Sequence, residues 1–261
     1  MNGRVLRIAR NVSLRLVEEG AEAVVLMGSY ARGDAYAESD LDIHAIGKGP
    51  EQRLEHDRGL LISISWATRR QNRLAFRNPR EVGAVIPAWR SAMIIYDPRG
   101  IAKTLKRTAK DWSWKCLGNR VDRWVAEELT SYSEEVHKLV GNLRLGRRSA
   151  AAVQRSLLAI RMAPILAAHH RILYDTENQL WDLVSTKMGQ EWTRLQSIAL
   201  GENDGEFEET CEAVLQLFSL AAQEVKHLLD ERQCAVVAHA CEIAGYPLSG
   251  RSSVPSASER G

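Results

Sequence analysis

The segment between two short apolar runs constrains the fold more than any other part of the sequence. The runs are AVVLM at 23–27 and LDIHAI at 41–46, and both are rich in residues that favour strands. Between them lies GSYARGDAYAESD, in which Gly28 and Ser29 directly follow the first run. This order predicts a strand, a turn that leads into a helix near Ser29, and then a second strand.

Further patterns extend this beginning into an α/β unit. Apolar spacing predicts helices over 4–19 and 68–77, and short runs predict strands over 60–65 and 93–96. After Gly100 only helical patterns remain, which predict helices over 101–116, 119–145, 149–174, 177–188 and 207–231. The predicted fold is therefore a small mixed sheet with helices, followed by an all-α bundle. We assign the catalytic domain to 1–104, the bundle to 105–246 and a disordered Ser-, Gly- and Pro-rich tail to 247–261.

Composition narrows the cellular context. The 261 residues are 45% hydrophobic and 26% charged, values typical of a globular protein. The N-terminus lacks the apolar core of a signal peptide. The sequence contains no uninterrupted run of about 18 apolar residues, so we expect no membrane span. Lys and Arg total 35 against 33 Asp and Glu, so we expect no stable nucleic-acid partner, although a local basic groove is not excluded. We expect a cytoplasmic protein with four free thiols.

Two aspartates carry the predicted chemistry. Asp40 and Asp42 are two positions apart at the second strand, so both carboxylates should point to one face of the sheet. Neighbouring carboxylates repel each other unless a cation lies between them, and Mg²⁺ with nucleotide phosphates fits this role. Gly28 lets the backbone approach a phosphate, the Ser29 hydroxyl can donate to it, and Arg32 lies one helical turn further on.

The pattern of Gly-Ser, ten residues and Asp-x-Asp resembles the nucleotidyltransferase superfamily. Four later segments are similar, in the same order, to segments of kanamycin-type aminoglycoside nucleotidyltransferases: IYDPRG at 95–100, TAK at 108–110, VAEEL at 125–129 and AHHRILYDT at 168–176. The resemblance covers about 25–190. It implies a two-domain enzyme, a homodimer, nucleotide-binding residues at Gly28, Ser29, Arg32 and Ser39, and metal binding by Asp40 and Asp42.

The sequence departs from this family at two positions. The family usually has a third acidic residue on a later strand, and the matching position here is Ser63. Its proposed general base falls near Ser131, and we expect a carboxylate one turn away to replace it: Glu127 or Glu128 first, with Glu134 or Glu135 as alternatives. His44 shares the strand face of Asp42 and is a further candidate ligand or acid.

The resemblance implies a transferase that moves a nucleoside monophosphate, AMP from ATP, to a hydroxyl of a small molecule such as an aminoglycoside antibiotic. Two alternatives remain open: an antitoxin-type protein adenylyltransferase, and a nucleotide-binding homologue impaired in catalysis by Ser63. The helix predicted over 68–77 also carries Arg69, Arg70, Arg73 and Arg77, a basic face that is either merely solvated or contacts phosphate.

Overall fold

The computed structural model describes residues 3–203 and 205–248, which fall into two compact units. Of the described residues, the first unit holds 3–121 together with 170–184, and the second holds 122–169, 185–203 and 205–248. These bounds differ from the predicted division at 104/105. The helix after Gly100 packs on elements of the first unit, and the later segment 170–184 returns to it. Residues 249–261 of the predicted tail lie outside the described residues.

The first unit is built on a five-stranded mixed sheet with the strand order β3-β4-β2-β1-β5. β2 and β4 run parallel, and the other neighbouring pairs are antiparallel. The strands are β1 (Ala23–Leu26), β2 (Leu41–Ile46), β3 (Gln52–Asp57), β4 (Leu60–Ala67) and β5 (Met93–Tyr96). The four strands predicted from apolar runs are thus confirmed, and β3 is an addition.

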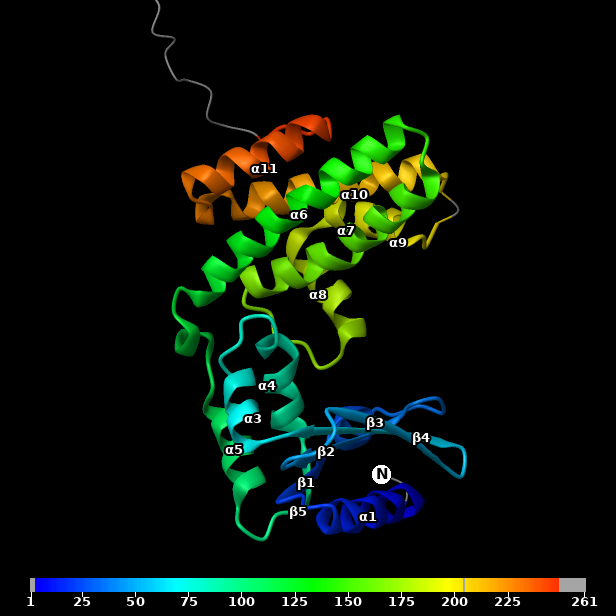
Figure 1. Cartoon of the computed structure of the whole chain (residues 1–261), viewed down its shortest axis with the longest axis vertical. Coiled ribbons are helices and arrows are strands. Elements are labelled where there is room, and N and C mark those ends of the chain that lie inside the picture. Colours follow the sequence, from blue (N-terminus) through cyan, green and yellow to red (C-terminus); the bar gives the residue numbers. More distant parts are fainter. Residues whose placement is uncertain (1–2, 204, 249–261) are drawn as a thin grey trace, which may run out of the picture. The chain divides into compact units, whose positions relative to one another are not determined.

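Alternation along β2 and β4 gives this sheet two different faces. On one face Leu41, Ile43, Ile62 and Ile64 are at most 1% exposed and pack on the apolar side of α1 (Gly3–Glu18). Val5, Ile8, Val12 and Leu16 of that helix recur at helical spacing and supply the other half of this core. We call this the apolar face; α1 lies along it (Figure 1). The opposite, polar face carries Asp42, His44, Ser63 and Ser65.

Helices α2 to α5 also belong to the first unit, and Figure 1 labels α3, α4 and α5. α2 (Gly28–Arg32) packs on β2, α3 (Arg69–Ala75) on β4, and α4 (Val82–Ser91) on α5 (Ile101–Asp111). α5 begins where the Asp97 carboxylate accepts hydrogen bonds from the backbone N–H groups of Ile101 and Lys103, at 2.7 and 2.9 Å. The Asp97-Pro98-Arg99-Gly100 turn therefore starts a helix that belongs to the α/β unit.

The second unit is helical throughout its described residues. Its elements are α6 (Arg120–Arg144), α7 (Arg148–His169), the end of α8 (Glu177–Met188), α9 (Gln190–Leu200), α10 (Phe207–Val225) and α11 (Glu231–Ile243). Two short 3₁₀ helices, Trp114–Leu117 and Lys226–Leu228, lie in the first and second unit respectively. α10 packs between α7 and α9 through residues such as Phe218 and Leu217, both at most 1% exposed.

Within the described part of the chain, α7 is the one helix long and apolar enough to cross a membrane by length and composition. Nearly half (44%) of its most apolar window is buried inside the unit, where Leu158, Met162 and Leu166 are fully covered. A core helix of a soluble protein meets the same criterion, so α7 is weak evidence for a membrane span. No membrane span is expected from the sequence, and α7 is nevertheless long and apolar enough to meet this criterion.

Candidate active site

Gly28 begins α2 directly after the end of β1, and its geometry admits no side chain. Its φ is +64°, in the left-handed region that residues with a Cβ rarely adopt. A Cβ added at Gly28 would lie 1.9 Å from Oδ2 of Asp42, far inside van der Waals contact. The glycine is thus required because the Asp42 carboxylate lies directly against the backbone at the start of α2.

Asp42 is the second residue of β2, and its backbone oxygen accepts a hydrogen bond of 2.9 Å from Met27 N–H. Burial is the main cause that raises the pKa of its carboxyl group, to about 6. The neighbouring Asp40 carboxylate raises this pKa further, whereas Arg32 lowers it. Asp40 itself lies just before the strand. The two predicted metal ligands therefore interact electrostatically, as the Asp-x-Asp spacing predicts.

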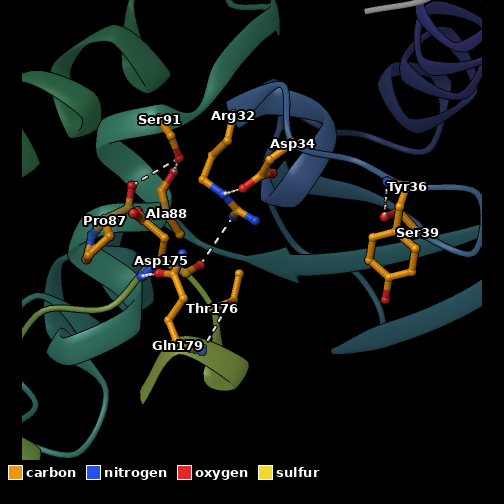
Figure 2. A network of polar contacts seen from close by, with 10 residues as sticks. All are labelled: Arg32, Asp34, Tyr36, Ser39, Pro87, Ala88, Ser91, Asp175, Thr176 and Gln179. Carbon is orange, nitrogen blue, oxygen red and sulfur yellow. Dashed lines mark hydrogen bonds and ion pairs between the residues drawn. The ribbon is translucent and has the colours of Figure 1, made fainter. Parts of the chain in front are cut away.

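Arg32, at the end of α2, is held in a polar network (Figure 2). Its Nε donates to Asp34 Oδ2 at 3.1 Å, and its Nη1 donates to the backbone oxygen of Asp175 at 3.2 Å. The side chain is only 13% exposed. Arg32 thus joins α2 to the returning segment 170–184 while its charge acts on Asp42. Sequence reasoning did not identify this anchor, which pairs residues 143 positions apart.

The returning segment is fixed on α4 by backbone and ring contacts. Tyr174 N–H donates to the Gly83 backbone oxygen at 3.0 Å, and a Cβ at Gly83 would lie 2.6 Å from the Tyr174 ring. Glycine inside α4 therefore makes room for Tyr174. Tyr174 and Asp175 belong to the segment AHHRILYDT, which is among the segments singled out in the sequence. The position of this segment beside α4 could not be predicted from the sequence, because it depends on the tertiary fold.

Ser29 lies in α2, and Ser39 lies in the turn that precedes Asp40. The backbone oxygen of Ser29 accepts from Gly33 and Asp34 N–H, which ends α2. Ser39 is 8% exposed, and its Oγ accepts a 2.9 Å hydrogen bond from Tyr36 N–H in the turn before Asp40 (Figure 2). Ser39 thus positions the chain that enters Asp40, and its contact with nucleotide stays a prediction.

Ser63 lies at the position that the sequence predicted for the third carboxylate. In the parallel pairing of β2 and β4 it is the direct partner of Asp42, and in the antiparallel pairing with β3 it is opposite Leu54. Asp42, Ser63 and Leu54 all point to the polar face. This row of the sheet therefore holds one carboxylate, one hydroxyl and one leucine. A serine in this row adds no negative charge for a metal ion.

His44 is not positioned as a ligand or acid. The amide nitrogen of Asn72 donates to the backbone oxygens of Ala67 and Thr68, so its Oδ1 accepts from His44 Nε2 at 3.0 Å. His44 Nδ1 then accepts from the Ser65 hydroxyl at 2.8 Å. Burial lowers the pKa of His44 to about 4, although the Asn72 hydrogen bond opposes the shift. The imidazole is thus a neutral, hydrogen-bonded part of the polar face.

Glu127 and Glu128 lie on α6 in the second unit, where Glu127 is exposed and Glu128 is half-buried. Glu134 and Glu135 on the same helix both form ion pairs with Lys138, at 2.8 and 3.0 Å. Their roles as general base or substrate contact therefore stay predictions, with Glu127 and Glu128 less engaged than the alternatives.

Comparisons with known proteins agree with this geometry. Residues 9–86 match the sequence profile of the family described as nucleotidyltransferase domain. The chain is similar to the crystal structure of a nucleotidyltransferase-like protein from Exiguobacterium sibiricum 255-15, with 11% sequence identity and a TM-score of 0.50, over 92% of this chain and 77% of that one. At this identity the likeness shows the fold alone. No curated protein matches the sequence, and the kanamycin-type resemblance is not confirmed. The first unit thus has a nucleotidyltransferase-like fold.

Proposed function

We propose that the protein transfers a nucleoside monophosphate, AMP from ATP, to a hydroxyl group of a small molecule. The observation that supports this most is the contact of Asp42 with Gly28, which places a carboxylate against the backbone at the start of α2. Backbone N–H groups in the first turn of a helix suit a phosphate, and the carboxylate of Asp42 beside them would suit a metal ion. The match of residues 9–86 to the nucleotidyltransferase domain supports the same reaction.

The donor set fits a divalent cation. Asp42 is half-buried and interacts with Asp40, so the charged form of its carboxyl group is costly, and this is the electrostatic setting that a cation relieves. Asp40 and Asp42 would hold the ion, Mg²⁺ by the hardness of their oxygen ligands. When bound, such an ion neutralises charge that develops on the transferred phosphoryl group.

The other residues have roles in positioning. Backbone N–H groups at Gly28 and Ser29, with the Ser29 hydroxyl, orient the triphosphate for in-line attack. Arg32 restrains the segment 170–184 and adds positive charge beside Asp42. The sequence offers Glu127 or Glu128 as the base for the acceptor hydroxyl, and this role stays a prediction. An aminoglycoside as acceptor, a homodimer and a cytoplasmic location belong to this proposal through the family resemblance.

One observation supports an alternative. Because Ser63 is the direct neighbour of Asp42, the site has two carboxylates where the family usually has three. A protein of this kind could bind nucleotide and metal without turnover. Transfer of AMP to a protein remains the other alternative from the sequence.

The test is transfer of label from α-³²P-labelled ATP in the presence of Mg²⁺ and a panel of aminoglycosides. We expect labelled antibiotic from the natural protein and none from Asp40→Asn or Asp42→Asn. Asp57→Asn is the matched control, because it removes a partly exposed carboxylate from β3 of the same sheet. Labelled protein would favour transfer of AMP to a protein. Bound ATP without transfer would favour nucleotide binding without turnover. Equal transfer by Asp42→Asn and the natural protein would refute the metal-site assignment.

A further inference from the structure

Positive charge is concentrated in one segment of the first unit. Residues 69–120 contain 13 Lys or Arg and only three Asp or Glu, a formal net charge of +10. The rest of the chain then has −8, which gives the total of +2. The expectation of no nucleic-acid partner rested on that total, which averages two regions of opposite charge.

The structure gathers part of this charge in a cavity beside α3, which packs against α5 (Figure 1). The cavity has a volume of about 1020 Å³, and no acidic residue lines it. Its lining includes five arginines, which together define the arginine groove: Arg69, Arg70, Arg73, Arg77 and Arg120. α3 alone, from Arg69 to Ala75, is about 9 Å long at the helical rise of 1.5 Å per residue, and Arg77 follows two residues later. A site of this length offers more than one phosphate position.

Most of these guanidinium groups are not neutralised within the protein. Among the described residues, Arg70, Arg73 and Arg77 have no hydrogen-bond or ion-pair partner, whereas Arg69 pairs with Glu22 at 2.5 Å. Arg120 donates to backbone oxygens of Leu117 and Cys116, which leaves its charge uncompensated. Arginines three or four positions apart on a helix repel one another. The groove thus carries an electrostatic cost that an anionic ligand would relieve.

The groove continues towards the polar face of the sheet. A second cavity of about 860 Å³ shares Leu74, Arg77 and Arg120 with it and is also lined by His44 and Met27. Met27 directly precedes Gly28, where the candidate phosphate site begins. A chain bound along α3 would therefore lie in a concave surface that is continuous with the neighbourhood of the nucleotide site.

We propose that the arginine groove binds the phosphate backbone of a single-stranded nucleic acid, RNA or DNA. Guanidinium groups bind phosphates through paired hydrogen bonds, and a row of them suits a chain of phosphates. The aromatic residues of the groove, Phe76 and Trp112, are 3% and 7% exposed, so they offer no platform on which bases could stack. Binding is therefore independent of base sequence. This property goes beyond the proposed transfer reaction and does not require it.

The experiment measures binding of fluorescein-labelled 12-nucleotide RNA and DNA by anisotropy between 50 and 200 mM NaCl. Each backbone phosphate contact on a single strand contributes about −0.7 to the slope of log K against log salt, so three contacts weaken binding roughly 20-fold over this range. The triple variant Arg70→Ala/Arg73→Ala/Arg77→Ala should reduce the slope by about 2 and weaken binding at least 10-fold at 50 mM salt.

The control is Arg7→Ala/Arg10→Ala/Lys48→Ala, which removes three exposed cations elsewhere in the same unit and changes the net charge equally. It should retain most of the affinity. Equal loss in both triple variants would show that only net charge matters and would overturn the proposal. So would binding of anionic phospholipid vesicles without binding of either oligonucleotide. Circular dichroism checks that both variants remain folded.

Discussion

The two faces of the five-stranded sheet have opposite effects on the stability of the fold. Ile43 and Asp42 are neighbours on β2, yet Ile43 is 1% exposed in the core against α1, whereas Asp42 places a carboxylate beside Gly28 and Asp40. Burial of the apolar face stabilises the fold by about 25 cal/mol per Å². On the polar face, the repulsion between carboxylates and their burial cost stability in the metal-free protein. The proposed site is therefore located where the sheet is least favourable to folding.

The largest expected effect comes from the polar face. Asp42→Ala should lower nucleotidyl transfer about 1000-fold, because a single remaining carboxylate at Asp40 holds the cation poorly. The melting temperature should stay the same or rise, since a half-buried carboxylate that is repelled by Asp40 is removed. Transfer assays and thermal unfolding on the same samples test both parts. A variant that unfolds at lower temperature in step with its activity loss would contradict the division between the faces.

The neighbouring position should respond in the opposite way. Ile43→Ala leaves a cavity against α1 and should lower the free energy of unfolding by about 3 kcal/mol. Activity per folded molecule should change little at temperatures where the variant is folded. Urea unfolding followed by tryptophan fluorescence gives the stability. Loss of most activity in the folded variant would show that the two faces are coupled.

Gly28 lies against the Asp42 carboxylate, and a double-mutant cycle isolates this contact. Gly28→Ala should destabilise the natural protein by about 2 kcal/mol, from strain at positive φ and from the clash with the carboxylate. In the Asp42→Ala background the carboxylate is absent, and we expect only about 1 kcal/mol from the backbone strain. Equal effects in both backgrounds would exclude the steric contact.

The smallest effect is a pH dependence of stability without metal. The pKa of Asp42 in the folded state is raised to about 6 from 3.8, so the folded protein binds this proton more tightly than the unfolded chain. The corresponding stability is fully present below pH 3.8 and is lost as the pH rises through 6. In EDTA, Asp42→Asn should thus become more stable than the natural protein by about 1 kcal/mol at pH 7.5, after allowance for partial solvent screening. Urea unfolding from pH 4.5 to 7.5 tests this, and parallel curves for the two proteins would refute it.

Elements with strong apolar patterns were predictable, and elements held by tertiary contacts were not. The run LDIHAI coincides with β2, but β3 has the sequence QRLEHD, which lacks an apolar face and forms a strand because it pairs with β4. α4 contains Gly83 and Pro87, which disfavour helices in isolation. The predicted helix 149–174 ends at His169, since the next residues fold back onto the first unit.

The candidate site shows the same division. The spacing of Gly28, Asp40 and Asp42 was enough to predict a shared site, and register places Ser63 beside Asp42 as the sequence indicated. The neutral state of His44 could not be predicted, because it depends on burial of the imidazole by the folded chain. In the sequence, the arginine groove was visible only as a basic face of the helix predicted over 68–77. That face was either solvated or in contact with phosphate.

The sequence by itself determined the strands with apolar runs, the paired aspartates and the glycine beside them, because these depend on residues close together in the chain. The tertiary structure decided which carboxyl group is buried, which histidine is neutral and which arginines share a cavity. These properties depend on solvent exclusion and on contacts between distant segments, such as Arg32 with Asp175 and Tyr174 with Gly83. Local patterns carry no record of those distances, so only the folded chain defines them.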